Sequence, residues 1–384
     1  MSTRSRGTSD RDLVGRSLLQ VITSTDRRGA EVFALQLGAE MRRRSWSVRT
    51  VALAPGAQPD GLEVDTLARH RREPRALLRL REAARSVDLV VAHGSTTLPA
   101  CALALAGAAT PFVYRNIGDP GAWGVSPRRR LQSRLCLRRA RAVVALSPAA
   151  ADDVAARYHV PRSVIVSIPK GVPTSQFRPA DAAARSAARA ALGLDDATPT
   201  VAVIGALSPE KQVELAIDAV ARIPGAHLLV AGDGSERTAL ERLADRILGA
   251  RCTFLGAVAD PAPIYAATDV VVSTSRTEGL PGVLIEAGLC GLPVVASDVG
   301  YVREIVDPGR TGALVPAGDA AATADAIAWA LREGDELGPA ARDRCQARFA
   351  LDTVAARWDE LLRSLLEPGR AVAPAAVPAI GVDP

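Results

Sequence analysis

The chain has 384 residues and a net charge of +5 at pH 7, with 48% apolar, 23% charged and only 3% aromatic residues. This length suits two domains rather than one core, and so few aromatic residues argue against stacking platforms for a nucleic-acid partner. Five scattered cysteines and four scattered histidines lack disulfide or zinc spacing, and no apolar run is long enough to predict a membrane span.

Short runs rich in Val, Ile, Leu and Ala alternate with helical stretches, a pattern typical of parallel sheets covered on both faces. In the first half we expect strands at 18–23, 48–54, 88–92, 111–115, 142–146 and 164–168. Helices are predicted between them at 30–44, 74–86, 96–107, 127–139 and 148–157. Strands of the second half are predicted at 200–205, 227–231, 252–255, 269–273, 293–296 and 312–315.

Proline and glycine interrupt this alternation at Pro169, Gly171, Pro173 and Pro179, which indicates a linker. We therefore predict a flexible extension (1–16), an N-terminal domain (17–175) and a C-terminal domain (176–348). The apolar spacing of residues 349–367 predicts a last helix that packs back on the N-terminal domain. The Ala- and Pro-rich segment 368–384 is expected to be a disordered tail.

Charge is distributed unevenly between the two halves. Residues 1–180 carry 29 Lys and Arg against 14 Asp and Glu, whereas the remaining residues carry 18 against 28. The basic half favours an anionic ligand or an anionic membrane surface; solvated helix faces in an Arg-rich chain are the alternative. Because the polar start is no secretory signal, we expect a cytoplasmic protein, with peripheral contact at the inner face of the membrane as the finer hypothesis.

Residues 273–288 carry the strongest functional signal. A predicted buried strand runs into a polar loop with Glu278, and a helix is expected to open near Gly282 with Glu286 about one turn inside. Ligands bind beyond the carboxyl ends of strands in such sheets, and the N–H groups at a helix start can bind phosphate. Two carboxylates suit a ligand rich in hydroxyl groups. For either glutamate alone, local capping or solvation is the alternative.

A second signal comes from a lysine in a chain that uses arginine almost everywhere. Lys170 and Lys211 are the only two lysines among 47 basic residues, which marks positions where a compact ammonium fits better than a planar guanidinium. Lys211 follows a predicted strand and a turn at Gly205, at the expected start of a helix. The helix dipole disfavours a cation there unless an anion is bound, so we expect Lys211 to bind a diphosphate. A frayed surface lysine is the alternative.

Residues 278–286 (EGLPGVLIE) resemble the E-x7-E motif of family 4 retaining glycosyltransferases of the GT-B fold. Residues 204–211 are similar to the G-R-L-x-x-x-K segment of that family, and residues 231–234, 254–256, 287–296 and 309–312 match further segments. Residues 28–31 (RGAE) and 168–172 (IPKGV) look like its G-G-A-E helix start and I-P-N-G-V linker. The resemblance covers nearly all of 17–366 and implies an α/β fold of two Rossmann-like domains facing across a cleft.

The resemblance also implies an activity, namely transfer of a hexosyl group from a UDP- or GDP-sugar to an acceptor hydroxyl with retention. Glu286 would bind the ribose hydroxyls, Glu278 the transferred sugar and Lys211 the diphosphate, with the departing phosphate oxygen as base and no metal or other obligatory cofactor. The donor-binding positions carried over are Gly29, Gly205, Lys211, Gly232, Glu278, Gly279, Leu280, Pro281, Gly282 and Glu286. The acceptor class stays open between a sugar, a lipid-linked glycan of polysaccharide biosynthesis and a small molecule.

Three departures from the family pattern concern catalysis. Ala206 stands where the family has an arginine, and Arg28 replaces the first glycine of the G-G pair. Residues 111–118 lack the histidine of many members, so Asn116 is expected to face the sugar instead. His93, at the end of a predicted strand, is a second catalytic candidate, with a structural histidine as the alternative. Asp10 and Asp12 follow no strand and are not interpreted as a metal site.

Two other function classes fit the same resemblance. A nucleotide-sugar epimerase shares the fold and needs no acceptor, so incubation of the donor alone would reveal it. A non-catalytic paralogue that only binds nucleotide is suggested by Ala206 and the absent histidine. Such a paralogue would bind donor without turnover.

Overall fold

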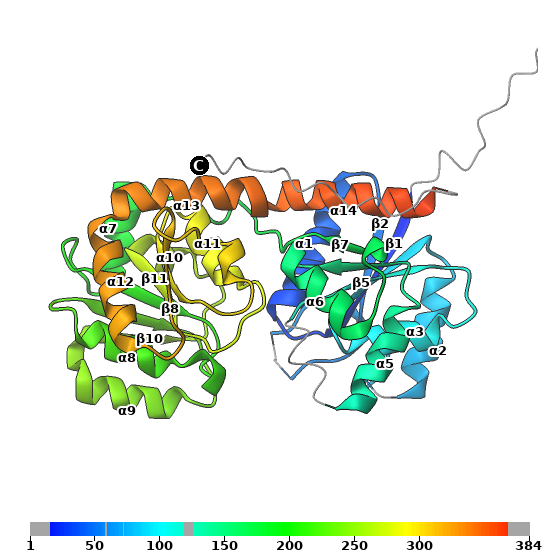
Figure 1. The fold of residues 1–384 in the computed structure, drawn as a ribbon, viewed down its shortest axis with the longest axis horizontal. Helices are drawn as coiled ribbons and strands as arrows, with labels where there is room; N and C mark the ends of the chain where they lie inside the picture. Colours follow the sequence, from blue (N-terminus) through cyan, green and yellow to red (C-terminus); the bar gives the residue numbers. More distant parts are fainter. Residues whose placement is uncertain (1–15, 58–59, 72, 119–125, 368–384) are drawn as a thin grey trace, which may run out of the picture. The chain divides into compact units, whose positions relative to one another are not determined.

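The computed structural model describes residues 16–57, 60–71, 73–118 and 126–367 (Figure 1). The chain forms two compact units: unit 1 runs to Ile168 and resumes at Ala355, and unit 2 runs from Pro169 to Val354. The change of unit falls in the proline- and glycine-rich segment, slightly before residue 175. The expected flexible extension, except for Arg16, the expected tail 368–384 and the Asp10/Asp12 pair lie outside the described residues.

Unit 1 is built on a parallel sheet of seven strands in the order β3-β2-β1-β4-β5-β6-β7. The strands are β1 (Ser17–Ser24), β2 (Ser47–Ala54), β3 (Asp65–Thr66), β4 (Leu89–His93), β5 (Phe112–Arg115), β6 (Ala142–Ala145) and β7 (Ile165–Ser167). The helices are α1 (Gly29–Arg43), α2 (Pro74–Ala84), α3 (Thr97–Ala104), α5 (Pro127–Leu137), α6 (Pro148–Tyr158) and the short η2 (Arg162–Val164). Only β3 lies outside the predicted strands, because two exposed polar residues give no apolar run.

Unit 2 contains a parallel sheet of six strands in the order β10-β9-β8-β11-β12-β13. The strands are β8 (Thr200–Ile204), β9 (His227–Ala231), β10 (Cys252–Gly256), β11 (Val270–Ser273), β12 (Val294–Ser297) and β13 (Gly312–Val315). The α-helices are α7 (Ala182–Ala191), α8 (Val213–Ala221), α9 (Arg237–Ile247), α10 (Ala262–Ala267), α11 (Gly282–Leu289), α12 (Ala320–Arg332) and α13 (Gly334–Phe349). Short 3₁₀ turns are η3 (Pro209–Lys211), η4 (Gly249–Arg251) and η5 (Val302–Glu304). The predicted α/β fold class is confirmed.

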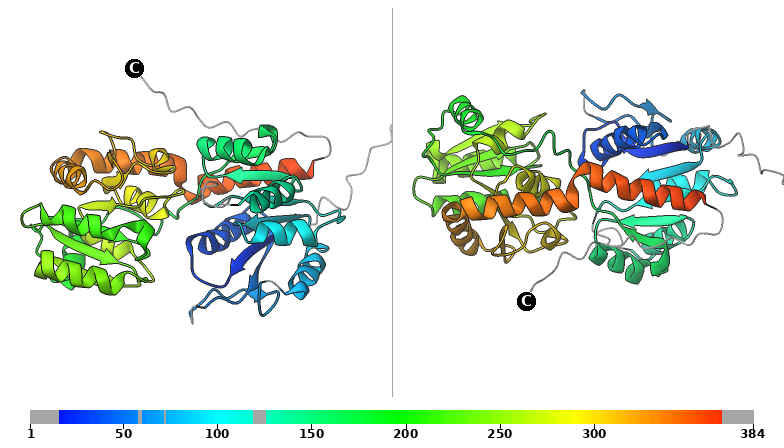
Figure 2. Two further views of the ribbon diagram at one scale, coloured as in Figure 1. Left: turned by 60° about the horizontal axis from the view of Figure 1, so that its bottom comes forward. Right: turned by 90° about the horizontal axis from the view of Figure 1, so that it is seen from above.

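Each strand is a continuous hydrophobic run in the sequence because it buries apolar side chains on both faces of its sheet. In β8, Val201 and Val203 belong to a large core with α8 and α12, whereas Ala202 between them packs in a smaller core with Leu194 and Ile264. Successive strand residues point to opposite faces, so a sheet covered on both sides needs an apolar residue at every position. Figures 1 and 2 show helices on both sides of each sheet.

Several helices begin where the sequence supplies an N-cap. The Ser147 hydroxyl accepts from the backbone N–H of Ala150 at the start of α6, and Pro148 occupies the first helical position. Asp181 and Asp319 accept corresponding N–H bonds at the starts of α7 and α12. These side chains satisfy donors that the first helical turn leaves free. Among the described residues, no helix combines the length and apolar character that a membrane span requires.

The last helix, α14 (Leu351–Leu366), belongs to unit 1 from Ala355 onward. Its apolar stripe, which includes Trp358 and Leu362, is fully buried, and Figure 2 shows the helix in red along unit 1. Asp359 accepts hydrogen bonds at 2.6 Å from the Trp46 indole Nε1 and from Arg363 Nε. The break between α13 and α14 comes at Ala350, whose extended backbone pairs with Val172.

Replacement of Trp358 by alanine tests the contribution of α14 to unit 1. We expect Trp358→Ala to lower the free energy of unfolding by about 3–5 kcal/mol, because a large buried side chain leaves a cavity. Exposed Glu360 on the same helix provides the control, and Glu360→Ala is expected to stay within about 0.5 kcal/mol of the wild type. Urea unfolding measures both. Equal stabilities of the two variants would contradict this packing.

Candidate functional site

The candidate residues of unit 2 lie at the point where the strand order of the sheet reverses. Strands β8 and β11 are neighbours although three helices and two strands separate them along the chain, because β9 and β10 extend the sheet on one side and β12 and β13 on the other. In open parallel sheets, the loops that follow the two strands at such a reversal diverge and leave a crevice for ligands. Lys211 follows β8 and Glu278 follows β11.

Lys211 and Glu278 are in direct contact. Lys211 Nζ lies 2.6 Å from Glu278 Oε1, and the Ser275 hydroxyl donates to the same oxygen at 2.7 Å. The Glu278 side chain is mostly buried, whereas the Lys211 ammonium is partly exposed. An ammonium has three N–H donors, so Lys211 can keep its bond to Glu278 and still donate to an anion in solvent.

The loops after β8 and β11 are joined by further hydrogen bonds. The Thr274 hydroxyl lies 2.8 Å from the carbonyl oxygen of Gln212, and the backbone N–H of Arg276 donates to the carbonyl of Glu210 at 2.8 Å. Lys211 ends the 3₁₀ turn η3, and α8 begins only at Val213, because Gln212 has a left-handed backbone with φ of +48°. The predicted helix start at Lys211 is therefore displaced by two residues.

Glu286 makes contacts of its own on α11. The Tyr265 hydroxyl donates to Glu286 Oε2 at 2.9 Å, and Lys170 Nζ lies 3.8 Å from Glu286 Oε1. Burial raises the pKa of Tyr265 well above its ordinary value, and the adjacent Glu286 carboxylate raises it further. Thus each of the two lysines of the chain lies beside one of the two motif glutamates. Lys170 was marked by its rarity, but its partner could not be predicted.

Two glycines in this region allow close approach of other atoms. A Cβ at Gly282, the first residue of α11, would overlap Lys170 Nζ and contact Glu286. A Cβ at Gly232 would overlap the carbonyl oxygen of Gly205, and both residues have φ near +150°. Gly205 itself faces open space. The other donor-loop positions connect β11 to α11: Gly279 accepts from the N–H of Tyr301, Leu280 is buried, and Pro281 is the N-cap residue of α11.

In unit 1, His93 ends β4 and lies buried beneath α1. Its Nε2 is 2.9 Å from Gln20 Oε1, and the amide nitrogen of Gln20 donates to the carbonyl of Ala34. Gln20 therefore offers His93 an acceptor, which places the imidazole proton on Nε2. Burial, and then the neighbouring charge of Arg115, lower the pKa of His93 well below its ordinary value. Its Nδ1 has no partner among the described residues, so contact of His93 with a substrate stays a prediction beside the structural alternative.

Sequence reasoning did not single out Arg115, the register neighbour of His93 at the end of β5. Its guanidinium is only 2% exposed and lies 4.0 Å from the centre of the Phe33 ring, and its Nε and Nη1 have no partner among the described residues. Burial lowers the pKa of Arg115 to about 9, so the side chain keeps its charge at neutral pH. Both amide atoms of the adjacent Asn116 are likewise buried without a partner in the described structure.

Gly29, the N-terminal donor candidate, is the first residue of α1. Arg28 before it is the N-cap residue, and its side chain makes no capping bond but lies 3.5 Å from the Asp26 carboxylate. Within the described parts of the chain, no three His, Cys, Asp or Glu side chains gather closely enough to hold a metal ion.

Comparison with known proteins identifies the class. Residues 198–333 match the family described as glycosyl transferases group 1, and residues 27–176 match glycosyltransferase family 4. The first match lies within unit 2, and the second lies largely within unit 1. The solved structures that resemble this chain have the GT-B fold. The chain belongs to the family 4 glycosyltransferases of the GT-B fold.

Particular relatives are similar over different parts of the chain. The D-inositol 3-phosphate glycosyltransferases of Mycobacterium tuberculosis and Mycobacterium bovis are 38% identical over 205 residues, which is 51% of this chain. The chain spans 41% of the length of these curated relatives. The structure of HepE from Anabaena in complex with UDP has a TM-score of 0.80 and 26% identity, and covers 91% of this chain and 100% of HepE. The structure of sucrose-phosphate synthase from Thermosynechococcus elongatus has a TM-score of 0.77 and 25% identity, and covers 91% of this chain and 99% of the synthase chain.

The two buried arginines Arg115 and Arg189 allow a matched stability test. Arg189 is also fully buried, but it donates to the carbonyl oxygens of Asp195, Ala267 and Thr198. We expect Arg115→Met to raise the stability of the ligand-free protein by about 1 kcal/mol, because an unpaired buried charge is removed. Arg189→Met should lower it by about 3–5 kcal/mol, because three carbonyls lose their donor.

Calorimetric unfolding of both variants and of the wild type provides the comparison. A loss of stability in Arg115→Met as large as that in Arg189→Met would show that the Arg115 guanidinium is already satisfied in the free protein.

Proposed function

We propose that this protein transfers a hexosyl group from a nucleotide diphosphate sugar to an acceptor hydroxyl, with retention of the anomeric configuration. The observation that carries the proposal is the pairing of each motif glutamate with a lysine: Lys211 with Glu278 and Lys170 with Glu286. Crystal structures of HepE in complex with UDP and with UDP-glucose, at 26% identity, support a UDP-sugar as the first donor to test.

In this proposal the chemistry depends on neutralising the leaving diphosphate. Lys211 donates to phosphate oxygens while Glu278 holds its ammonium in place at 2.6 Å, and the N–H groups at the start of α11 supply further donors. Donors placed where negative charge develops stabilise the transition state strongly. The departing phosphate oxygen then takes the proton of the acceptor hydroxyl, so the protein needs to supply no base of its own.

Glu286 is proposed to bind the ribose hydroxyls. The Tyr265 hydroxyl donates to one of its carboxylate oxygens and Lys170 Nζ lies 3.8 Å from the other, yet an ionised carboxylate has about four acceptor positions and can receive two hydroxyl donors in addition. Asn116 is proposed to face the transferred sugar, since its amide atoms have no partner within the described residues. Gly29 is proposed to let α1 approach the donor phosphates.

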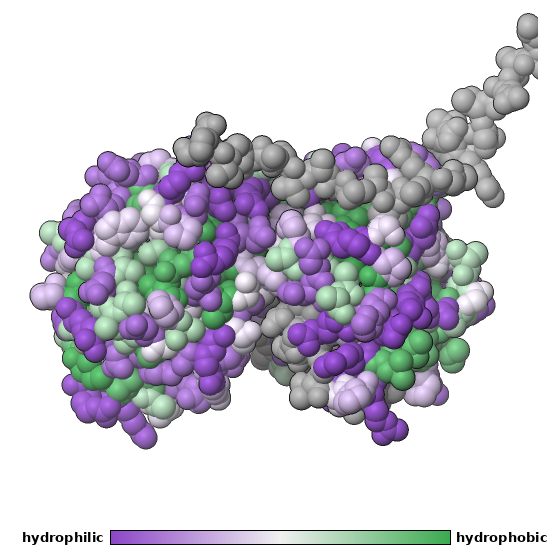
Figure 3. Space-filling view, viewed as in Figure 1, coloured by the Kyte–Doolittle hydropathy of each residue, from purple (hydrophilic) through white to green (hydrophobic). Residues whose placement is uncertain are grey.

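The acceptor is proposed to bind unit 1, and unit 1 to contact an anionic membrane. The four most exposed large apolar side chains of the described residues lie on adjacent helices of this unit: Leu78 on α2, Leu103 on α3, and Leu131 and Leu135 on α5, each 55–67% exposed. The same three helices carry seven arginines and one glutamate. Figure 3 shows apolar surface among hydrophilic side chains where Figure 1 labels these helices. Together, basic and apolar residues suit the surface of an anionic bilayer.

Donor binding tests the site. We expect Lys211→Ala and Glu286→Ala to weaken UDP-glucose binding by roughly 1–3 kcal/mol each, the effect of one lost charge-assisted hydrogen bond. That is about 5- to 150-fold in Kd by calorimetry. Glu210→Ala is the control, because the Glu210 carboxylate accepts from Ser208 within its own turn. If both site variants bind like the wild type, the assignment is wrong. A new sugar epimer from donor alone would point to the epimerase alternative.

Vesicle binding tests the membrane contact. We expect the protein to co-sediment with vesicles that contain phosphatidylserine at low salt, and to be released by high salt as the charges are screened. Leu131→Asp and Leu135→Asp should each reduce binding, because they add a negative charge and remove apolar area from α5. Ile247→Asp on α9 of unit 2 is the matched control at an exposed apolar site. No binding at low salt would remove this part of the proposal.

A further inference from the structure

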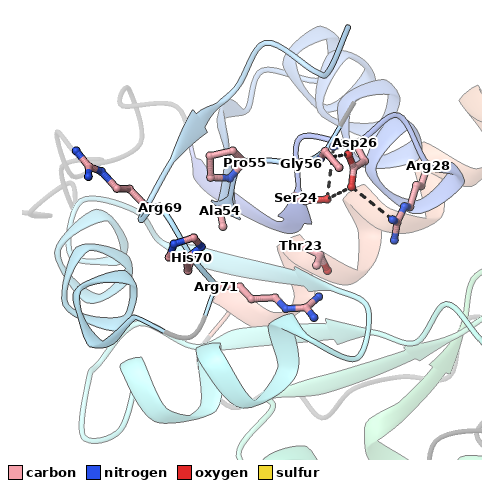
Figure 4. Close-up of a pocket in the computed structure, with 11 residues that line it drawn as sticks. Thr23, Ser24, Asp26, Arg28, Ala54, Pro55, Gly56, Arg69, His70 and Arg71 are labelled. Atoms are coloured by element: carbon pink, nitrogen blue, oxygen red, sulfur yellow. Dashed lines mark hydrogen bonds and ion pairs between the residues drawn. The ribbon is translucent and has the colours of Figure 1, made fainter. Parts of the chain in front are cut away.

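A cavity of about 410 Å³ lies in unit 1 at the carboxyl ends of β1 and β2. Figure 4 shows Arg71 extending into it beside His70 and Thr23, whereas Arg69 is turned outward. The cavity is also lined by Ser24, Asp26, Arg28, Ala54, Pro55, Gly56 and Ala57. Its size falls in the range of roughly 300–1,000 Å³ that is usual for small-molecule sites.

The charged side chains around this cavity differ in whether they have hydrogen-bond or ion-pair partners. Asp26, its only acidic lining residue, accepts from the Ala57 N–H at 2.7 Å and the Ser24 hydroxyl at 3.0 Å, and lies 3.5 Å from Arg28. Arg71 takes part in no ion pair or hydrogen bond with any other described residue. The cavity thus holds a guanidinium that is available to an anion.

A second cavity, of about 480 Å³, lies between α2, α3 and α5, and we call it the apolar groove. Leu77, Pro99, Ala100 and Leu103 line it together with Thr96 and Gln132, and none of the described residues that line it is acidic. Arg71 also lines this groove. One guanidinium that has no partner among the described residues therefore borders both a cavity with several charged side chains and a cavity lined mainly by apolar residues.

We propose that Arg71 binds the phosphate group of an amphiphilic acceptor, whose hydrocarbon chain lies in the apolar groove and whose polar part lies in the cavity beside Thr23. A guanidinium binds phosphate oxygens in pairs, which suits Arg71 to this group. Burying the chain against Leu77 and Leu103 removes apolar surface from water. The proposal rests on the proposed function in that it names the acceptor class, but binding itself requires no donor.

Farnesyl phosphate is a suitable probe, since it joins one phosphate to a short hydrocarbon chain. We expect the wild type to bind it in calorimetry at least tenfold more tightly than farnesol, D-inositol 3-phosphate or inorganic phosphate. The neutral probe lacks the group for Arg71, and the soluble phosphates lack the chain for the groove. Equal affinity for farnesyl phosphate and the soluble phosphates would overturn the role of the groove. Equal affinity for farnesyl phosphate and farnesol would overturn the role of Arg71.

Matched variants separate the two contacts. Arg71→Met should weaken farnesyl phosphate binding at least tenfold and Arg69→Met by less than twofold, because only Arg71 extends into the cavity. Leu103→Asp should weaken it similarly, whereas Leu135→Asp, on α5 but outside the groove lining, should not. All four side chains are exposed, so the variants should fold, and thermal unfolding checks this. Unchanged binding by Arg71→Met or Leu103→Asp would overturn the proposal.

Glycosyl transfer provides the separate readout. Because farnesyl phosphate has no alcohol hydroxyl to receive a sugar, transfer is measured with acceptors that carry one. Farnesyl phosphate binding together with no transfer from a UDP- or GDP-sugar to any hydroxylated acceptor would leave this inference standing and contradict the proposed function. Transfer to a hydroxylated amphiphilic acceptor that carries a phosphate, with the same KM in Arg71→Met as in the wild type, would support the proposed function and contradict the inference.

Discussion

The direct contact between Lys211 and Glu278 depends on one topological constraint, the adjacency of β8 and β11 in a parallel sheet. All strands of such a sheet end at the same edge, so residues far apart in sequence meet there only if their strands are neighbours. The reversal of strand order between β8 and β11 supplies that condition in unit 2. In unit 1 the reversal lies between β1 and β4, where His93 ends β4, whereas the cavity beside Thr23 lies at the ends of β1 and β2. Each sheet thus brings its polar loop residues to the edge where its strand order turns.

What each of these sheet edges can bind depends on which of its polar groups already have a hydrogen-bond or ion-pair partner. In unit 2 the glutamates and lysines neutralise one another, which lowers the cost of holding four charged groups in half-buried positions while leaving acceptor and donor capacity for a ligand. A lysine suits this arrangement because its ammonium donates in three directions from one point, whereas a guanidinium would demand a planar partner. The overlap that a Cβ at Gly282 would have with Lys170 shows how closely the helix start and the ammonium approach.

Much of this fold could be predicted from the sequence, because a strand that is buried on both faces has an unbroken run of apolar residues, as in residues 201–204 and 228–231. The nearness of Lys211 and Glu278 was implied by the family resemblance alone, because the sequence does not show that β8 and β11 are neighbours. The partner of Lys170 could not be predicted, since its contact with Glu286 joins the linker to α11 through tertiary packing alone. The left-handed backbone of Gln212 was missed, because this residue is neither a glycine nor a proline that would mark a change of backbone direction.

Arg115 illustrates a different limit of sequence reasoning. An arginine that ends a strand is ordinarily solvated, and only the packing of Phe33 from α1 over the end of β5 buries it. Arg189, in contrast, is buried with carbonyl partners for every part of its guanidinium. Arg115, unlike Arg189, has two buried N–H groups without a hydrogen-bond partner among the described residues. Burying them costs free energy at the carboxyl edge of the sheet in unit 1. Such local costs persist at functional sites, where binding of a ligand supplies the missing contacts. The atoms of Arg115 and Asn116 that have no partner among the described residues therefore fit the proposal that a substrate binds at this edge of unit 1.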